Sequence, residues 1–177
     1  MSPEISERSF EESIEETLTQ GSSNKTLDGA SVAGEAIGWF SGRPGGYRKR
    51  LPEDYDRGLC LVPDDVLDFI LATQANEWNK LRQHHGASIK EQFLQRVSSE
   101  IARRGALDVL RHGVKDSGCK FQLAYFRPSS GLNEALQRLH AANLFAVIRQ
   151  LRFSEKSKKS LDLVLFLNGI PIFTAEL

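Results

Sequence analysis

The sequence predicts an α/β (α+β) fold, in which a mixed sheet containing an antiparallel hairpin is flanked by helices. Apolar residues recur at helical spacing before Gly118, and the period becomes strand-like after it. Asn168-Gly169 then joins two β-rich apolar runs, which is a strong hairpin signal. The length of 177 residues suits one domain. We therefore expect a single domain over 1–177, helix-rich over 1–118 and with its sheet core at 119–177.

The helical periodicity is clearest where apolar residues repeat every three or four positions. Phe10, Ile14 and Leu18 predict a short amphipathic helix with acidic flanks. Pro63 followed by two aspartates is typical of a helix start. We expect helices over 9–18, from 63 to about 81, over 88–112 as one helix or a bent pair, and over 133–143. The turn-rich stretch 20–57 contains aromatic residues and is expected to be an ordered excursion.

Strands are predicted where the pattern alternates or becomes continuously apolar. The candidates are 120–126, 146–153 and the two arms of the hairpin on either side of Asn168-Gly169. Both arms are too apolar for an exposed hairpin, so we expect the pair at the centre of a sheet covered by helices.

Composition excludes several classes of protein. Hydrophobic residues make up 40% and charged residues 26%, which is the balance of a globular domain. Lys plus Arg and Asp plus Glu number 23 each, so net charge alone does not mark a nucleic-acid binder. No apolar run approaches the roughly 18 residues of a membrane span, and no membrane partner is expected. Two cysteines in a chain of this length favour a reducing compartment, so a cytoplasmic location is expected.

The hairpin contains two carboxylates that could bind metal. Asp162 lies near the start of one arm and Glu176 near the end of the other. Acidic residues are costly in such strands unless they are paired or bind a cation. Mg²⁺ prefers one or two carboxylates with water and phosphate oxygens, so the pair is a candidate metal site for phosphodiester hydrolysis. The alternative is that Asp162 begins a strand and Glu176 is a solvated residue.

The register of the hairpin decides whether these carboxylates can share an ion. A strict two-residue turn at Asn168-Gly169 would place Asp162 and Glu176 on opposite faces of the sheet. A shared site needs a three-residue loop or a bulge, and Pro171 favours such an irregularity because it cannot donate to a regular ladder. We therefore predict an irregular turn with both carboxylates on one face.

The segment Leu161–Leu177 resembles the nuclease signature of type I restriction endonuclease R subunits, a branch of the PD-(D/E)xK nucleases. In that family an Asp and an apolar strand are followed by Asn-Gly-Leu-Pro, a second strand and Glu-Leu-Lys. Supporting blocks are Phe69-Ile70, Thr73-Gln74, Trp78, Arg104-Gly105, Arg149-Gln150 and Ser154. The resemblance covers most of 60–177 and the glutamate-bearing helix at 7–18.

The resemblance implies a restriction-endonuclease-like mixed sheet and Mg²⁺-dependent cleavage of double-stranded DNA. Asp162 and Glu176 match the metal-binding carboxylates, and Glu11, with Glu7 as the alternative, matches a helix glutamate that assists them. The family's catalytic lysine would follow Leu177, so we expect a piece of a longer subunit that is inactive by itself. No ATP-motor motif is found, and ATP would serve only the full-length subunit. The implied partners are the methylation (M) and specificity (S) subunits.

Two basic groups are candidate DNA contacts. Lys156, Lys158 and Lys159 precede Asp162 in a polar segment, and Arg48, Lys49 and Arg50 form a triplet beside an aromatic residue. For the triplet the alternative is a solvated turn. The rival interpretation of the whole chain is a non-catalytic docking or DNA-positioning module of a multisubunit DNA-processing complex.

Overall fold

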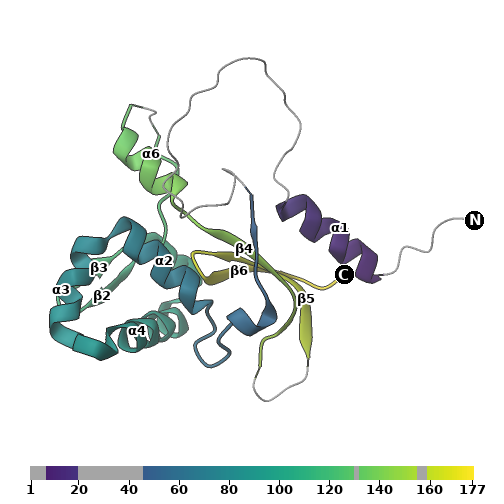
Figure 1. The fold of residues 1–177 in the computed structure, drawn as a ribbon, viewed down its shortest axis with the longest axis horizontal. Coiled ribbons are helices and arrows are strands. Elements are labelled where there is room, and N and C mark those ends of the chain that lie inside the picture. Colours follow the sequence, from purple (N-terminus) through teal and green to yellow (C-terminus); the bar gives the residue numbers. More distant parts are fainter. Residues whose placement is uncertain (1–6, 20–45, 130–131, 155–158) are drawn as a thin grey trace, which may run out of the picture.

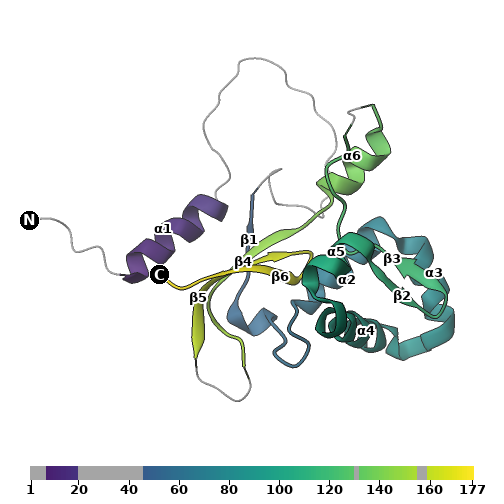
Figure 2. The ribbon, with the colours of Figure 1, turned by 180° about the vertical axis from the view of Figure 1, so that it is seen from behind.

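A four-stranded mixed sheet forms the middle of the protein, with a lobe of helices at one end and a single helix at the other (Figures 1 and 2). The computed structural model describes residues 7–19, 46–129, 132–154 and 159–177. The helix at the far end from the lobe is α1 (Glu7–Thr19). The predicted combination of helices, a mixed sheet and an antiparallel hairpin is confirmed.

The sheet has the strand order β1-β4-β5-β6. Its strands are β1 (Arg48–Lys49), β4 (Phe145–Arg152), β5 (Ser160–Leu167) and β6 (Ile170–Ala175). Strand β1 runs parallel to β4, and the other neighbours are antiparallel. The expectation of a central hairpin is right for β5 and wrong for β6, which lies at the edge of the described sheet with Phe173 54% exposed. An apolar run does not by itself distinguish an inner strand from an edge strand.

The helical lobe follows the predicted periodicity, except that the helix expected from 63 to about 81 is divided at Gln74, whose φ and ψ are not helical. It contains α2 (Pro63–Thr73), α3 (Ala75–His85), the short helix η2 (Gly86–Ser88), α4 (Ile89–Arg104) and α5 (Ala106–His112). The predicted bent pair is confirmed, because the helix breaks at Gly105, whose φ of 85° few other residues adopt. A small hairpin of β2 (Val114–Asp116) and β3 (Cys119–Phe121) completes the lobe.

Two apolar clusters form the core. The larger one fills the lobe, where Phe93 packs edge-on against Phe121 with ring centroids 4.9 Å apart. The smaller one lies on the sheet, where Ile148, Val164 and Phe166 pack against Tyr55. Tyr55 follows the short helix η1 (Pro52–Asp54), so the segment after β1 covers this part of the sheet.

The division into a helix-rich first part and a sheet core after residue 118 is not clean. The first part contributes β1, and helix α6 (Glu134–Ala141) lies within the second. The predicted strand over 120–126 is wrong beyond Phe121, where no strand is assigned. Side-chain amides replace the ladder there: Gln74 accepts a hydrogen bond from the Gln122 N–H at 2.7 Å and donates to its carbonyl at 2.9 Å. Of the predicted excursion over 20–57, residues 20–45 lie outside the described residues.

The turn between β5 and β6 is a regular two-residue turn, so the predicted irregular turn is wrong. Leu167 pairs with Ile170, and Asn168 and Gly169 have φ values of 51° and 78°. Two positive φ values define a type I′ turn, which matches the twist of the strands. A Cβ at Gly169 would lie 2.4 Å from the Val62 carbonyl oxygen at the start of α2, so close packing also requires glycine.

The irregularity lies instead within β6. Phe166 pairs with Pro171, whereas Leu165 pairs with Phe173, so Ile172 is an extra residue that forms a bulge. Beyond the bulge Leu163 pairs with Ala175, the last residue of β6, and the same register continued by one residue would place Glu176 opposite Asp162. The bulge therefore shifts the register by the one residue that would put Asp162 and Glu176 on the same face of the sheet. It lies directly after Pro171, the residue from which an irregularity was predicted.

Candidate functional site

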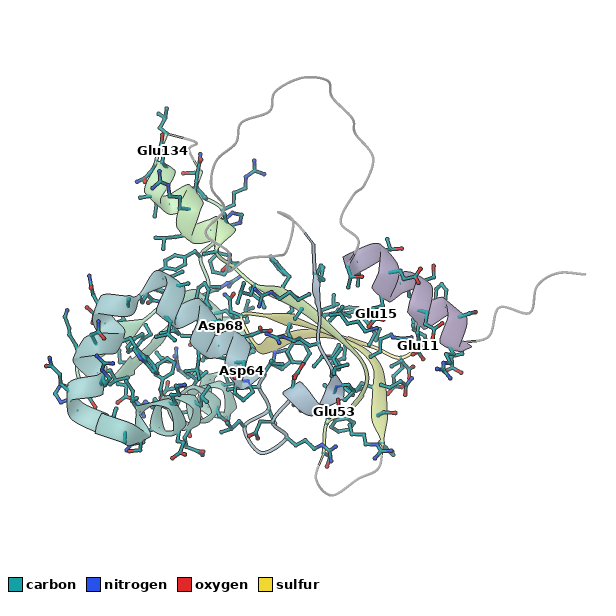
Figure 3. All side chains as sticks on the ribbon, in the orientation of Figure 1. Glu11, Glu15, Glu53, Asp64, Asp68 and Glu134 are labelled. Atoms are coloured by element: carbon teal, nitrogen blue, oxygen red, sulfur yellow. The ribbon has the colours of Figure 1, made fainter. Side chains whose placement is uncertain are left out.

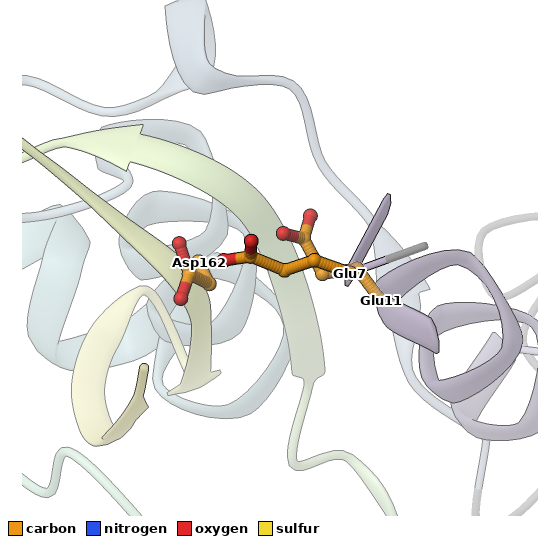
Figure 4. Close-up of side chains that lie close together, drawn as sticks. All are labelled: Glu7, Glu11 and Asp162. Carbon is orange, nitrogen blue, oxygen red and sulfur yellow. The ribbon is translucent and has the colours of Figure 1, made fainter. Parts of the chain in front are cut away.

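Three carboxylates from two elements converge at the end of the sheet that faces α1. Glu7 and Glu11 lie one turn apart on α1, and Asp162 projects from β5 (Figure 4). One oxygen from each of the three lies within 4.8 Å of the others. Residues four apart share a face of a helix, which explains why both glutamates reach the same point. Both sequence candidates for the helix glutamate therefore belong to one cluster.

The cluster lies in an open cleft between α1 and the sheet. The cleft has a volume of about 770 Å³ and is lined by Glu7, Arg8, Glu11, Arg149, Gln150 and Asp162. Glu11 is only 3% exposed, whereas Asp162 is half-buried and Glu7 is exposed. The cleft therefore contains carboxylates at its wall and at its mouth, open to a ligand from solvent.

Helix α1 turns its acidic side, and not its apolar stripe, toward the sheet. Glu11 and Glu15 are the buried residues of the helix, and Figure 3 shows both between α1 and the strands. Phe10, the first residue of the apolar stripe, is 49% exposed. Ile14 and Leu18 of the same apolar stripe are only partly buried, so the helix buries two glutamates most deeply, and the sheet offers these glutamates cations.

Arg149 and Lys49 are those cations. Arg149 Nε lies 3.2 Å from Glu15 Oε2, and its Nη1 lies 3.9 Å from Glu11 Oε2. Lys49 Nζ lies 2.8 Å from the same oxygen of Glu15. Buried charges persist when they are paired in this way. The ion pairs thus position α1, and with it Glu11, over the end of β4.

Gln150 connects the helix to Asp162. Its Nε2 donates to Glu11 Oε1 at 2.8 Å and to Asp162 Oδ1 at 3.2 Å. Asp162 Oδ2 also accepts the backbone N–H of Leu177 at 2.8 Å. Sequence reasoning found Asp162 and the helix glutamates but gave Arg149 and Gln150 no place in the site. Two polar residues inside the otherwise apolar run 145–151 were the signal available.

Glu176 is not part of the three-carboxylate cluster. It lies just after β6 and is exposed, and only a continuation of the β5–β6 register beyond Ala175 would place it opposite Asp162. Its assignment as a metal ligand stays a prediction. The structure brings Glu7 to Asp162 and Glu11 instead.

The basic triplet 48–50 has internal partners. Arg48 and Arg50 both contact Asp65, which is fully buried at the start of α2. The hydrogen bond from Arg50 to Asp65 is the main cause that raises the pKa of Arg50. Because Lys49 pairs with Glu15, all three side chains are engaged within the protein, and their DNA contact stays an untested prediction.

The second basic group is described only in part. Lys156 and Lys158 lie outside the described residues, whereas Lys159 is exposed just before β5.

The chemistry of the donor set fits a hard divalent cation. All three groups offer carboxylate oxygens, the ligand type that Mg²⁺ prefers. Their negative charges are offset in part by hydrogen bonds from the Gln150 amide and the Leu177 N–H, and by Arg149 at 3.9 Å from Glu11. A cation at this point would relieve repulsion among groups that the fold holds together.

The fold and the site together define an α+β domain with an acidic cleft between a helix and a sheet. Residues 70–177 match a family model described as type I restriction enzyme R protein N terminus. The match covers more than half of the chain, and the chain belongs to this family. Comparisons with curated proteins and with solved structures each gave no match.

The family places the chain in a restriction system, as an N-terminal domain of a type I R subunit that takes part in a complex acting on DNA. The matched residues include Arg149, Gln150, Asp162 and Glu176 and leave out α1. No helix in the described parts of the chain is long and apolar enough to cross a membrane.

Proposed function

We propose that the acidic cleft is the metal-binding half of an endonuclease site that cleaves double-stranded DNA in a type I restriction complex. The observation that carries the proposal is the convergence of Glu7, Glu11 and Asp162 within 4.8 Å in a chain of this family. A structural role alone does not require three like charges at one point, since such a cluster costs stability without a cation.

Each carboxylate has a proposed role that follows from its place. Asp162 and Glu11 would hold Mg²⁺ from opposite sides of the cleft, and Glu7, at the open mouth, would complete the ligand set or bind a coordinated water. Glu176 would serve the same centre from the edge strand. A bound Mg²⁺ supplies a Lewis acid for the scissile phosphate and activates a water.

The remaining parts of the activity are assigned to groups outside the cleft. The family lysine is expected directly after Leu177, where it would stabilise charge at the attacked phosphate. Lys159 and its neighbours Lys156 and Lys158 are proposed to contact the DNA backbone beside the cleft. The M and S subunits would supply recognition, and ATP-driven translocation would belong to other domains of the subunit, in the cytoplasm.

Metal binding tests the site without any need for cleavage. Titration calorimetry with Mn²⁺ should detect binding to the chain, and Asp162→Asn should abolish it because the amide keeps the shape of the side chain and removes the charge. The matched control is Asp68→Asn, an exposed acid on α2 that should bind Mn²⁺ like the parent (Figure 3). Equal binding by the parent and by Asp162→Asn would exclude the site.

Cleavage is tested in an R subunit that carries this sequence as its N-terminal domain. Asp162→Ala should abolish cutting of plasmid DNA by the assembled complex and leave ATP hydrolysis intact. Cutting at the parent rate would favour the rival role, a non-catalytic docking or DNA-positioning module.

A further inference from the structure

The side chain of Gln150 lies where a cation joining Glu11 and Asp162 would lie. One NH₂ group donates to a carboxylate on α1 at 2.8 Å and to a carboxylate on β5 at 3.2 Å. Its partial positive charge bridges two anionic oxygens, as a metal ion would do with a larger charge. The other end of the amide is fixed, because Ser160 Oγ donates to Gln150 Oε1 at 3.1 Å.

The backbone at this residue is adapted to that position. Gln150 has a φ of 51°, a left-handed conformation that costs a residue with a Cβ about 1–2 kcal/mol. The ladder pairs Arg149 with Leu163 and Leu151 with Leu161, so Gln150 lies opposite Asp162. Strain of this kind persists where surrounding contacts over-determine it, and it concentrates at functional sites.

The faces of β4 also change at this point. Ile148 and Leu151 contribute to the same apolar cluster, although residues three apart in a regular strand point to opposite faces. Gln150 lies between them, and its left-handed backbone conformation turns the strand so that Leu151 points to the same face as Ile148. Gln150 itself is therefore outside the core. Because its side chain is exposed, the side chain can move without opening the fold.

A second cleft offers the displaced side chain a place. This cleft has a volume of about 340 Å³ and is lined by Pro52, Glu53, Arg57, Gln150 and Arg152. Gln150 is the residue that lines both clefts. Glu53, Arg57 and Arg152 on the walls of this cleft are polar groups with which a displaced amide could form hydrogen bonds.

We propose that Gln150 is a placeholder for the divalent cation. Its amide holds Glu11 and Asp162 together in the metal-free protein, and entry of the cation displaces it toward the second cleft. This inference rests on the proposed metal site. It implies that the wild-type affinity for metal includes the cost of breaking two hydrogen bonds to charged acceptors.

Removal of the amide should therefore tighten metal binding. We expect Gln150→Ala to bind Mn²⁺ about tenfold more tightly, which corresponds to about 1.4 kcal/mol. The metal-free variant should melt at a lower temperature, because two like-charged groups lose their bridge. Gln150→Gly, which retains the positive φ without strain, should show the same tightening if the alanine variant folds poorly.

Two further variants separate the amide from other effects. Ser160→Ala removes only the hydrogen bond that fixes the amide and should tighten binding by a smaller factor, about two- to threefold. Gln83→Ala changes an exposed glutamine on α3, outside both clefts, and should leave the affinity unchanged.

Nuclear magnetic resonance gives a direct readout of displacement. The side-chain NH₂ resonances of Gln150, identified by their absence in Gln150→Ala, should shift as diamagnetic Mg²⁺ is added to the wild-type chain. Asp162→Asn should suppress that shift. Resonances that stay fixed while backbone signals of α1 and β5 report metal binding would overturn the placeholder.

The outcomes also distinguish this inference from the proposed function. If the wild type binds Mn²⁺ through Asp162 but both Gln150 variants bind equally or more weakly, only the placeholder is wrong. If the wild type and both variants fail to bind, the metal site and the placeholder are both wrong. Tightening in Gln150→Ala and Gln150→Gly supports both.

Discussion

Replacement of Arg149 by Met should detach α1 from the sheet and leave the rest of the fold in place. Arg149 lies 3.2 Å from Glu15, 3.7 Å from Glu12 and 3.9 Å from Glu11. Methionine keeps the aliphatic bulk and removes the charge. Because the buried residues of α1 are Glu11 and Glu15, their carboxylates lose the cation that they share.

The magnitude follows from burial. Breaking a fully buried ion pair by removal of one partner costs about 3–5 kcal/mol. Arg149 is 21% exposed and Lys49 still pairs with Glu15, so we expect about 2–3 kcal/mol here. That is an increase of about 30- to 150-fold in the open population of the helix. A helix of 13 residues is marginal by itself, so the loss should appear as local opening.

Hydrogen exchange measured by mass spectrometry resolves this prediction by segment. Peptides over 7–19 should exchange about 30- to 150-fold faster in Arg149→Met, whereas peptides over β4 and β5 should be unchanged. The matched control is Arg138→Met, since Arg138 forms an ion pair with Glu134 in which both side chains are more than 80% exposed. Such a pair contributes at most a few tenths of a kcal/mol. Unchanged exchange over α1 in Arg149→Met would refute the argument.

Three further substitutions test the hairpin and the lobe. Asn168→Ala removes buried hydrogen bonds, one of them with the Leu144 N–H at 2.7 Å, and should lower the free energy of unfolding by about 3–4 kcal/mol; a loss under 1 kcal/mol in urea titrations would contradict this. Gly169→Ala, whose Cβ would meet the Val62 oxygen at 2.4 Å, should cost about 2–4 kcal/mol in the same assay, and a neutral result would show that the turn can shift. Hydrogen bonds from arginines, chiefly from Arg103 and then from Arg104, lower the pKa of Glu100, so its stabilising effect is present above the ordinary value of 4.5 and is lost as the pH falls through the lower folded-state pKa. Glu100→Gln should therefore be less stable than wild type near pH 7, and the difference should shrink in acid; a pH-independent difference would contradict this.

Local patterns predicted the elements whose stability is local. The helices of the lobe follow apolar residues at helical spacing. Helices α4 and α5 are separated at Gly105, a residue type that commonly ends helices. Asn168-Gly169 predicted the hairpin because few other dipeptides adopt two consecutive positive φ values. In these cases the residues that decide the structure are neighbours in the chain.

Pairing across the sheet was less predictable. The sequence indicated that an irregularity near Pro171 was needed, but not that Ile172 would form a bulge while the turn stayed regular. The turn is fixed by tertiary contacts of its two central residues. The Asn168 side chain binds the backbone at Leu144, and Gly169 packs against the start of α2, so the turn cannot expand into a longer loop.

The side of α1 that is buried could not be read from its own residues. The apolar stripe through Phe10 is the better candidate by hydrophobicity, yet Glu11 and Glu15 face the sheet. Their partners Lys49 and Arg149 come from two strands far along the chain. A helix can bury charged side chains where the surrounding structure supplies their ion-pair partners, and those partners are brought together only by the tertiary structure.

The same division holds for the candidate site. The sequence by itself determined that Asp162 is a carboxylate in an apolar strand and that Glu7 and Glu11 share one face of a helix, because both facts depend on spacing along the chain. Only the tertiary structure decided that these groups meet and that Gln150 lies between them, 139 residues from Glu11. Spacing fixes direction within one element, whereas distances between elements depend on how α1, β4 and β5 pack, which is the sum of many weak contacts and of the few buried charges that must find partners.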